Sequence, residues 1–487
     1  MAEVNRIRVC LKGKPMMGRN VWRQGYSGFF LFSLLPVHNT ILMKRPTLFL
    51  LLLSIAWLYC AARLSAQGGQ SKLLGYWHNW NDVNAPYIPL NLVDPRYDVV
   101  IVAFAIPEFG TDYKMSFQPD QGSTALFQSQ VQTLQAQGKQ VLISIGGATA
   151  PVSLDNAMER DTFVSTMLDI LNIYGFDGVD IDLEGASLLL SGGNISSPID
   201  SPIVNLITAV RQIMTTYQSQ FQKRMVLTMA PETAYVQGGM SGYGGIWGAY
   251  LPVIHALRDS LDVLMVQLYN SGSMYGIDQQ VYTQGTADFI VAMSEALITG
   301  FQTAGGYFAG LPAQKIAVGL PACPLAAGGG YTDTATVKAA LSYLRGEGPK
   351  PGNYSLSLAG GYPEVNKMMT WSINWDALAS CGGSYAYAEN FDRIFPDSLT
   401  TGWTDKGQAA FHIYPNPATD RISISLPGEG QATMLFHLYD ATGRLLRKEV
   451  ISAPHHTLDV AHLPPGHYLL QVKGAGFETQ KWLVKRD

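Results

Sequence analysis

Residues 174–185, which read Y-G-F-D-G-V-D-I-D-L-E-G, decide the fold. Asp180, Asp182 and Glu184 fall on every second residue, and aliphatic residues fill the positions between them. Side chains of a β-strand point alternately to opposite faces, so a strand here carries three carboxylates on one face and an aliphatic surface on the other. Neighbouring carboxylates repel one another, and burial makes this costlier. An ordinary surface strand mixes acids with Thr, Lys and Ser, so the all-acid face indicates acid–base chemistry.

Short aliphatic runs and helical patterns alternate on either side of this strand. Besides the acidic run, seven strands are predicted at residues 72–77, 97–105, 140–144, 225–230, 263–269, 315–320 and 367–371. Helices are predicted at residues 123–137, 158–174, 202–222, 247–260, 286–303 and 334–344. Such alternation indicates parallel βα units, and eight of them indicate an α/β fold of the closed (β/α)8 TIM-barrel type.

A doubly wound open sheet is the competing fold. It would carry a glycine-rich phosphate loop after its first strand. The sequence there is Tyr76-Trp77-His78-Asn79-Trp80, which is aromatic. The barrel is therefore favoured.

Four segments are predicted along the chain. Residues 1–42 are basic and have no periodic pattern, and we interpret them as an extension upstream of the true start at Met43. Residues 43–66 combine a short basic stretch, an apolar run and a small residue before the cut, which predicts a secretory signal peptide. Residues 67–408 form the predicted barrel. Residues 409–487 show short alternating strands and turns without a helix pattern, which predicts a small all-β sandwich.

Composition excludes several classes of protein. Of the 487 residues, 47% are hydrophobic, which suits a large core and excludes disorder. Residues 1–66 hold nine Lys or Arg and one acid, so the remainder carries 24 basic and 36 acidic residues, a net charge of −12 against −4 for the whole chain. An acidic surface disfavours nucleic acid as a partner. We expect a monomer.

Cysteines are few once the signal peptide is removed. Only Cys323 and Cys381 remain, which allows at most one disulfide, and the sequence leaves open whether they pair. There is no Cys/His cluster with the spacing of a zinc site. We therefore expect neither a metal ion nor a cofactor.

The run D-G-V-D-I-D-L-E at residues 177–184 resembles the active-site strand of glycoside hydrolase family 18, the chitinase family, whose pattern is D-x-x-D-x-D-x-E at the end of the fourth barrel strand. Ser144-Ile145-Gly146-Gly147 resembles the S-x-G-G of the same family. The resemblance implies a chitinase that hydrolyses the β-1,4 linkages of N-acetylglucosamine in chitin. It also implies a retaining mechanism in which the substrate acetamido group forms an oxazolinium ion.

Site residues follow from the same resemblance, since barrel enzymes place them at the C-terminal ends of strands. Glu184 is expected to be the acid and then the base that activates water. Asp182 is expected to orient the acetamido group, Asp180 to share a proton with Asp182, and Tyr269 to donate a hydrogen bond to the acetamido oxygen. Trp371 is expected to form the apolar floor under the sugar. The remaining expected substrate-binding residues are Tyr76, Ser144, Met229, Gln267 and Asn270.

Two departures from the family pattern carry information. Many members have Asp after the tyrosine of the sixth strand, whereas this chain has Asn270, as in the plant class III and short bacterial branch. Residues 321–366, between the seventh and eighth strands, hold one predicted helix and a glycine-rich loop. This segment leaves no room for the insertion that deepens the cleft of processive relatives, so we expect an open groove and endo-type cleavage.

The C-terminal segment carries a second resemblance. Its motifs are Tyr414-Pro415-Asn416-Pro417, Leu438-Tyr439-Asp440, Gly443-Arg444 and Leu463-Pro464-Pro465-Gly466-His467-Tyr468. In this order they resemble the C-terminal sorting domain of type IX secretion substrates in Bacteroidetes. The resemblance implies that the secretion machinery is a partner and that the chain is secreted, free or attached to the cell surface. A carbohydrate-binding β-domain is the alternative, although its strands lack clustered exposed aromatics.

Two other functions remain open for the barrel. An endo-β-N-acetylglucosaminidase that cuts N-glycans shares the acidic-strand motif. Some barrels of the family are lectins that have lost the acid, but Glu184 and both aspartates are present here. The intact acid favours an enzyme.

Overall fold

The computed structural model describes residues 70–396, 412–414, 416, 418–425, 434–440, 444–451, 455–474 and 477–486. The expected upstream extension and signal peptide lie outside the described residues, as does the expected junction between the two domains. Within the described ranges, none of the helices combines the length and the apolar character needed to cross a membrane.

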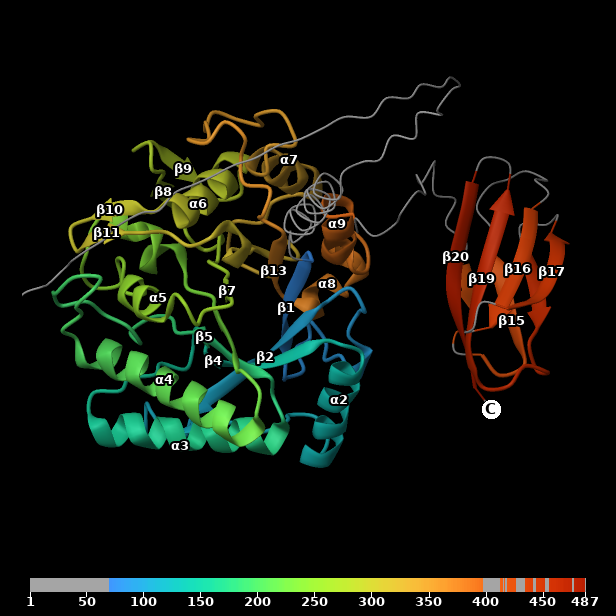
Figure 1. Ribbon diagram of the computed structural model, residues 1–487, viewed down its shortest axis with the longest axis horizontal. Coiled ribbons are helices and arrows are strands. Elements are labelled where there is room, and N and C mark those ends of the chain that lie inside the picture. Colours follow the sequence, from blue (N-terminus) through green and yellow to red (C-terminus); the bar gives the residue numbers. More distant parts are fainter. Residues whose placement is uncertain are drawn as a thin grey trace, which may run out of the picture. The chain divides into compact units, whose positions relative to one another are not determined.

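Eight parallel strands form the first sheet (Figure 1). In spatial order they are β12 (Val318–Pro321), β13 (Lys367–Trp371), β1 (Lys72–His78), β2 (Val99–Pro107), β4 (Gln140–Gly146), β5 (Gly178–Asp182), β6 (Val226–Met229) and β7 (Val263–Leu264). Parallel bridges from Leu264 to Ile316 and from Gln267 to Gly319 join the last strand to the first. The sheet therefore closes into the predicted (β/α)8 barrel.

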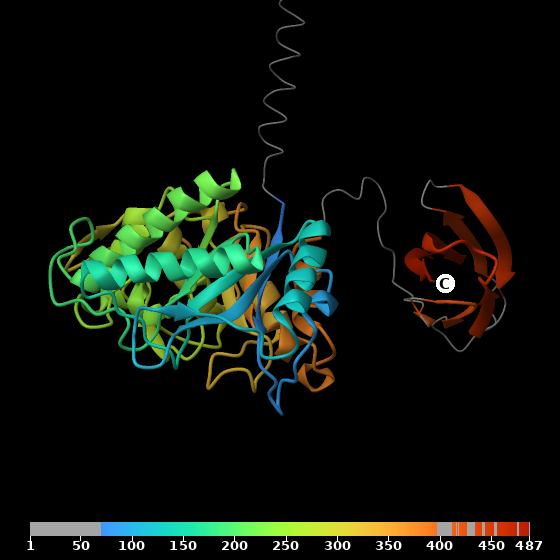
Figure 2. The ribbon, with the colours of Figure 1, turned by 90° about the horizontal axis from the view of Figure 1, so that it is seen from below.

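Helices cover the outside of the barrel. They are α2 (Thr124–Ala136), α3 (Ala157–Tyr174), α4 (Ser201–Phe221), α5 (Leu251–Leu257), α6 (Ala287–Thr299), α7 (Thr334–Leu344), α8 (Ile373–Asp376) and α9 (Ala386–Ile394). Figures 1 and 2 show α3 and α4 side by side, consistent with the contact between them. Ser123 caps α2 by accepting the Leu126 N–H, so the expected start of that helix is confirmed.

Three predicted elements differ from the structure. Within the helix predicted at 247–260, only α5 is an α-helix. Within the strand predicted at 263–269, only β7 is a regular strand. The helix predicted at 286–303 ends at Thr299, because Gly300 has φ 79° and donates its N–H to Ala296. Phe301–Thr303 is instead β10, which pairs with β11 (Gly306–Phe308) as a hairpin.

Short elements complete the loops. They are β3 (Met115–Ser116), the hairpin of β8 (Ser273–Tyr275) and β9 (Val281–Thr283), and the 3-10 turns η1 (Leu90–Leu92), η2 (Thr233–Tyr235), η3 (Gln237–Met240), η4 (Ala313–Lys315) and η5 (Ala379–Cys381). Cys323 and Cys381 form a disulfide with their Cα atoms 5.0 Å apart. The disulfide ties the segment after β12 to η5, beyond the end of β13.

Strand alternation divides the barrel into two cores. In β5, Val179 and Ile181 belong to the large core between strands and helices, whereas Asp180 and Asp182 point into the barrel. The close approach of β5 to β6 requires glycine at position 178, because a Cβ there would lie 2.0 Å from the Val226 carbonyl oxygen. The predicted alternation of acids and aliphatic residues is thus what places the carboxylates inside the barrel.

The C-terminal region contains two antiparallel sheets. One consists of β14 (His412–Tyr414), β15 (Arg421–Ser425) and β18 (His455–Asp459), and the other runs in the order β17 (Leu445–Ile451), β16 (Met434–Asp440), β19 (Gly466–Gly474) and β20 (Phe477–Lys485). Ile422 and Leu458 of the first sheet share a core with Phe436, Leu470 and Leu483 of the second. Two sheets that face each other across one core form the predicted small β-sandwich.

Candidate active site

The three acids of β5 lie at the C-terminal end of the barrel, where barrel enzymes place their chemistry. Asp180 and Asp182 are the last inward-facing residues of β5 and are 0% and 3% exposed. Glu184 follows two residues after the regular strand ends and is half-buried. It lies just beyond the strand, where it is more exposed than either aspartate.

Asp180 is held by hydroxyl groups from three other strands of the barrel. Tyr76 of β1 and Ser144 of β4 donate to its Oδ2 at 2.6 and 2.7 Å, and Thr228 of β6 donates to its Oδ1 at 2.6 Å. Burial raises the pKa of Asp180, and the three hydroxyl donors oppose this rise. Tyr76 and Ser144 are expected to bind substrate, and in the structure their hydroxyl groups donate hydrogen bonds to Asp180. The sequence alone does not indicate Thr228, because only the register between β5 and β6 places it opposite Asp180.

Gln267 links the other two acids. Its side-chain amide donates to Asp182 Oδ1 at 2.8 Å, to Glu184 Oε1 at 3.1 Å and to the Ala230 carbonyl at 2.9 Å. Burial raises the pKa of Asp182 well above its usual value, and the charges of Glu184 and Asp180 raise it further. Burial also raises the pKa of Glu184, against hydrogen bonds from Gln267 and Asp182 that lower it. The pair therefore retains a proton at a pH where free carboxyl groups are ionised.

Two tyrosines fix the backbone that carries Glu184. The Leu183 N–H donates to the hydroxyl of Tyr250 at 2.6 Å, and the hydroxyl of Tyr235 donates to the Gly185 carbonyl at 2.5 Å. The two rings pack edge to face with centroids 5.8 Å apart. The residues on both sides of Glu184 are therefore anchored, which restricts where its carboxyl group can lie.

Tyr269 lies near the acids and is buried. Burial, followed by the charges of Asp182 and Glu184, raises its pKa well above the usual value, so its hydroxyl keeps its proton. The charge of Glu232, the N-cap residue of η2, also acts on Tyr269, and burial followed by the charge of Glu184 raises the pKa of Glu232 itself. Tyr269 is therefore a neutral donor beside a carboxyl pair.

Trp371 ends β13 inside an aromatic cluster. Its ring is nearly parallel to that of Phe104, with centroids 6.0 Å apart, and its centroid lies 5.5 Å from that of Tyr76 and 4.8 Å from that of His78. His78 stacks on Trp80 at 4.6 Å, and burial lowers the pKa of His78 to about 4, so its ring is neutral. An uncharged aromatic surface of this kind suits the apolar face of a sugar ring.

Met229 and Asn270 do not join the cluster of acids. Met229 pairs in register with Ile181, and both belong to the core between strands and helices. Thr228 and Ala230 take the inward positions on either side of Met229. Asn270 is exposed, has φ 53° and donates its N–H to the Gly329 carbonyl at 3.1 Å. It lies at the rim, against the glycine-rich loop.

The described residues contain no group of three or more His, Cys, Asp or Glu side chains arranged to hold a metal ion. The arrangement instead offers a carboxyl pair that holds a proton, a neutral tyrosine donor and an aromatic surface. These groups suit acid–base chemistry on a neutral polar substrate with an apolar face.

Comparisons with known proteins agree with this geometry. Residues 72–406 match the family "Glycosyl hydrolases family 18", and residues 412–486 match the "Secretion system C-terminal sorting domain". Chitinase Chi52 of Paenibacillus xylanexedens is 46% identical over 341 residues, 69% of this chain and 63% of the relative. Chitinase D of Niallia circulans is 45% identical over 344 residues, 69% of this chain and 64% of the relative. The matched regions thus span less than two thirds of the length of either relative.

A solved structure shows the same fold. The family 18 chitinase from Chromobacterium violaceum is 37% identical and superimposes with a TM-score of 0.59, covering 66% of this chain and 85% of that chain. The match confirms the barrel fold that was expected from the strand and helix pattern.

Proposed function

Because the chain belongs to glycosyl hydrolase family 18, we propose that it is a secreted, endo-acting chitinase that hydrolyses β-1,4 linkages between N-acetylglucosamine units. One observation carries the proposal: the proton-holding pair Asp182 and Glu184, bridged by Gln267, lies at the C-terminal end of a closed barrel. The names of the two curated relatives support the choice of chitin as substrate.

Glu184 is the proposed general acid. A glycosidic oxygen needs a proton as its bond to the anomeric carbon breaks, and a carboxyl group supplies it best when its pKa is raised. Burial raises the pKa of Glu184, and its half-exposed position lets it reach a substrate that lies across the barrel mouth. After the leaving sugar departs, the same carboxylate takes a proton from the attacking water.

The proposed nucleophile is the acetamido oxygen of the substrate. Asp180 and Asp182 approach from the same strand as Glu184, so neither is placed to attack from the opposite face of the sugar. Asp182 would accept the acetamido N–H, and the Tyr269 hydroxyl would donate to the acetamido oxygen. The oxazolinium ion that forms carries positive charge, which the carboxylates of Asp182 and Asp180 stabilise.

Asp180 has a supporting role in this scheme. Its two oxygens already accept from Tyr76, Ser144 and Thr228, so it does not reach the substrate. Its charge raises the pKa of Asp182 and so favours retention of a proton by the pair of Asp182 and Glu184. We further propose that Asp180 shares a proton with Asp182.

Trp371 and its aromatic neighbours form the proposed floor of the subsite that holds the reacting sugar. Gln267 keeps the two acids in place, and Asn270 would meet the substrate at the rim. Between β12 and β13 the structure has one helix, α7, which supports an open groove and internal cleavage of the chain.

We place the catalytic barrel at residues 67–408 and the sorting domain at residues 409–487, following a signal peptide at 43–66. The two family matches, at 72–406 and 412–486, support this division. The sorting domain would direct a monomeric enzyme through the type IX secretion machinery to the cell exterior.

The decisive experiment compares initial rates on chitin oligomers and on a high-mannose glycopeptide. We expect release of short N-acetylglucosamine oligomers and no glycan release. Glu184→Gln, which keeps the shape and loses the transferable proton, should lower the rate by about 10²–10⁴-fold with binding retained. Glycan release without hydrolysis of chitin would identify an endo-β-N-acetylglucosaminidase, and binding without hydrolysis of either substrate would identify a lectin.

A further inference from the structure

A second cavity opens at the end of the barrel opposite the proposed active site. Its lining includes Lys72, Val99, Gln140, Val226, Val263 and Lys367, which are the first residues of β1, β2, β4, β6, β7 and β13. The acids lie at the C-terminal end of β5, so the two sites occupy opposite mouths of one barrel. The volume of the cavity is about 360 Å³.

Positive charge dominates this N-terminal cavity. Lys72, Arg224, Lys315 and Lys367 line it, and among the described residues of its wall Asp262 is the one acid. Arg224 is already paired with Asp262, with Nη1 to Oδ1 at 2.7 Å. Three lysines therefore remain as an excess of positive charge around a space large enough for a ligand.

The three ammonium groups are held mainly by neutral oxygens. Lys72 Nζ donates to the Gln140 side chain at 3.3 Å, and Lys315 Nζ donates to the Arg258 carbonyl at 2.7 Å. Lys367 Nζ donates to the Gln314 carbonyl at 2.6 Å and to Asn366 Oδ1 at 2.9 Å. Carbonyl and amide groups fix the positions of these lysines without cancelling their charge.

Lys367 shows most clearly how a buried, uncompensated positive charge affects the pKa of a lysine. It is 9% exposed, and burial together with the charge of Lys72 lowers its pKa to about 8. Burial lowers the pKa of Lys315, and the charges of Asp262 and Asp259 oppose this change. Asp98, beside Val99, has its Oδ2 bound by the Leu73 N–H at 2.8 Å. A buried ammonium that lacks a carboxylate partner is costly, and a bound anion would remove that cost.

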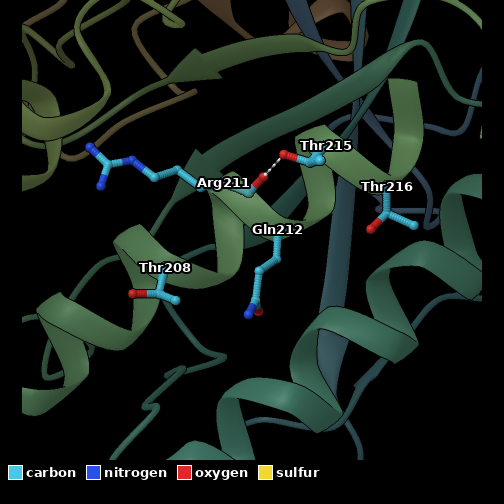
Figure 3. A pocket seen from close by; sticks show the side chains of 5 residues that line it. All are labelled: Thr208, Arg211, Gln212, Thr215 and Thr216. Carbon is cyan, nitrogen blue, oxygen red and sulfur yellow. Dashed lines mark hydrogen bonds between the residues drawn. The ribbon is translucent and has the colours of Figure 1, made fainter. Parts of the chain in front are cut away.

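A hollow on α4 provides a useful contrast. Figure 3 shows Thr208, Arg211, Gln212, Thr215 and Thr216 along one helix, with the Arg211 side chain directed away from the two last threonines. The Arg211 guanidinium donates to the Ala256 carbonyl at 2.6 Å, and Thr215 donates to the backbone of its own helix. The polar side chains of this hollow all come from one helix, whereas cationic side chains from several segments of the chain line the N-terminal cavity.

We propose that the N-terminal cavity binds a tetrahedral oxyanion, phosphate or sulfate, between Lys72, Lys315 and Lys367. Lysine binds such anions as a point charge with three rotatable donors, and each of these ammonium groups has a fixed position. A water molecule occupies about 30 Å³ of liquid, so the cavity has room for the anion and several waters. The anion can be a free inorganic ion or the ester group of a larger molecule.

Calorimetric titration of the full chain with inorganic phosphate, at constant ionic strength and pH 7, tests the proposal. We expect saturable binding at one site. Lys72→Met and Lys367→Met should each weaken it by about tenfold or more, since a hydrogen bond to a charged group is lost. Lys72→Arg keeps the charge and should bind, and Lys338→Met, an exposed position on α7, is the matched control and should bind as the wild type does.

Phosphate should also raise the melting temperature of the wild type and of Lys338→Met, with a smaller rise in Lys72→Met. Since Lys72 is only half-buried, Lys72→Met keeps the test valid even if Lys367→Met fails to fold. A titration with a sugar phosphate distinguishes a phosphate ester, which would bind more tightly than the free ion, from inorganic phosphate. Absence of saturable binding, or equal weakening by Lys338→Met, would overturn the proposal.

Discussion

Replacement of Thr228 by valine tests how the barrel holds a buried charge. Thr228 is 1% exposed, and its hydroxyl is the one that donates to Asp180 Oδ1, whereas Tyr76 and Ser144 both serve Oδ2. Valine has nearly the same volume, so the substitution removes the donor and leaves the packing almost unchanged. A net hydrogen bond to a charged group contributes about 1.5–3 kcal/mol. We expect Thr228→Val to lower the free energy of unfolding by that amount at pH 7.

The loss should depend on pH in a defined direction. Burial raises the pKa of Asp180 in the folded state above its unfolded value. Ionisation of Asp180 therefore lowers the free energy of unfolding; this loss is absent at low pH and develops as the pH rises through the folded pKa. Removal of a donor destabilises the ionised form more than the protonated form and raises this pKa further. The difference between Thr228→Val and the wild type should therefore shrink as the pH falls and Asp180 takes up a proton.

Differential scanning calorimetry of the barrel transition at pH 7 and at pH 4 measures this effect. Thr370 provides a matched control, because it is 0% exposed and its hydroxyl donates to a neutral group, the Leu320 carbonyl, at 3.0 Å. Thr370→Val should cost about 1 kcal/mol at either pH, and Thr228→Ser should retain most of the stability. An equal, pH-independent loss in Thr228→Val and Thr370→Val would refute the claim that Thr228 holds an anionic Asp180.

Three further predictions concern the acids, the disulfide and the C-terminal domain. Gln267→Leu removes a donor that lowers the pKa of Glu184, so the basic limb of the pH profile of kcat/KM should move to higher pH, and an unshifted limb would contradict the proposed role of Gln267. Cys323→Ser opens a disulfide across 58 residues and should cost about 4 kcal/mol of unfolding free energy in the chain-entropy account, measured by calorimetry; a loss below about 1 kcal/mol would contradict it. Deletion of residues 409–487 should abolish export and leave chitin hydrolysis by the purified barrel unchanged; a folded but inactive barrel would make the deleted segment part of the catalytic unit.

Much of the barrel is readable from the sequence, for physical reasons. Parallel strands buried on both faces appear as continuous aliphatic runs, and each of the eight predicted runs overlaps a barrel strand. The predicted helix at 334–344 matches α7, whose start is set by Asp333, which accepts the N–H groups of Ala335 and Thr336. The boundary at Gly300 is less readable, because the residues after it form the hairpin of β10 and β11 although the sequence predicts that the helix continues to residue 303.

The site could be predicted only in part, because contacts between strands depend on register. The acids are recognisable from their spacing along one strand. The partnership of Thr228 with Asp180 depends on how β6 aligns with β5, which no local pattern encodes. Met229 illustrates the same limit, because a shift of one residue reverses the face of a strand, and Met229 shares its outward face with Ile181.

The central claim is that the substrate supplies the nucleophile while Glu184 supplies the proton. The most direct test measures initial rates of the wild-type enzyme on a chitin oligomer and on the same oligomer deacetylated at the cleaved sugar. If Asp182 and Tyr269 hold an acetamido group that attacks the anomeric carbon, the deacetylated oligomer should react at least about 10²–10³-fold more slowly. Equal rates on the two oligomers would contradict the account and would require a protein carboxylate or a water molecule as nucleophile.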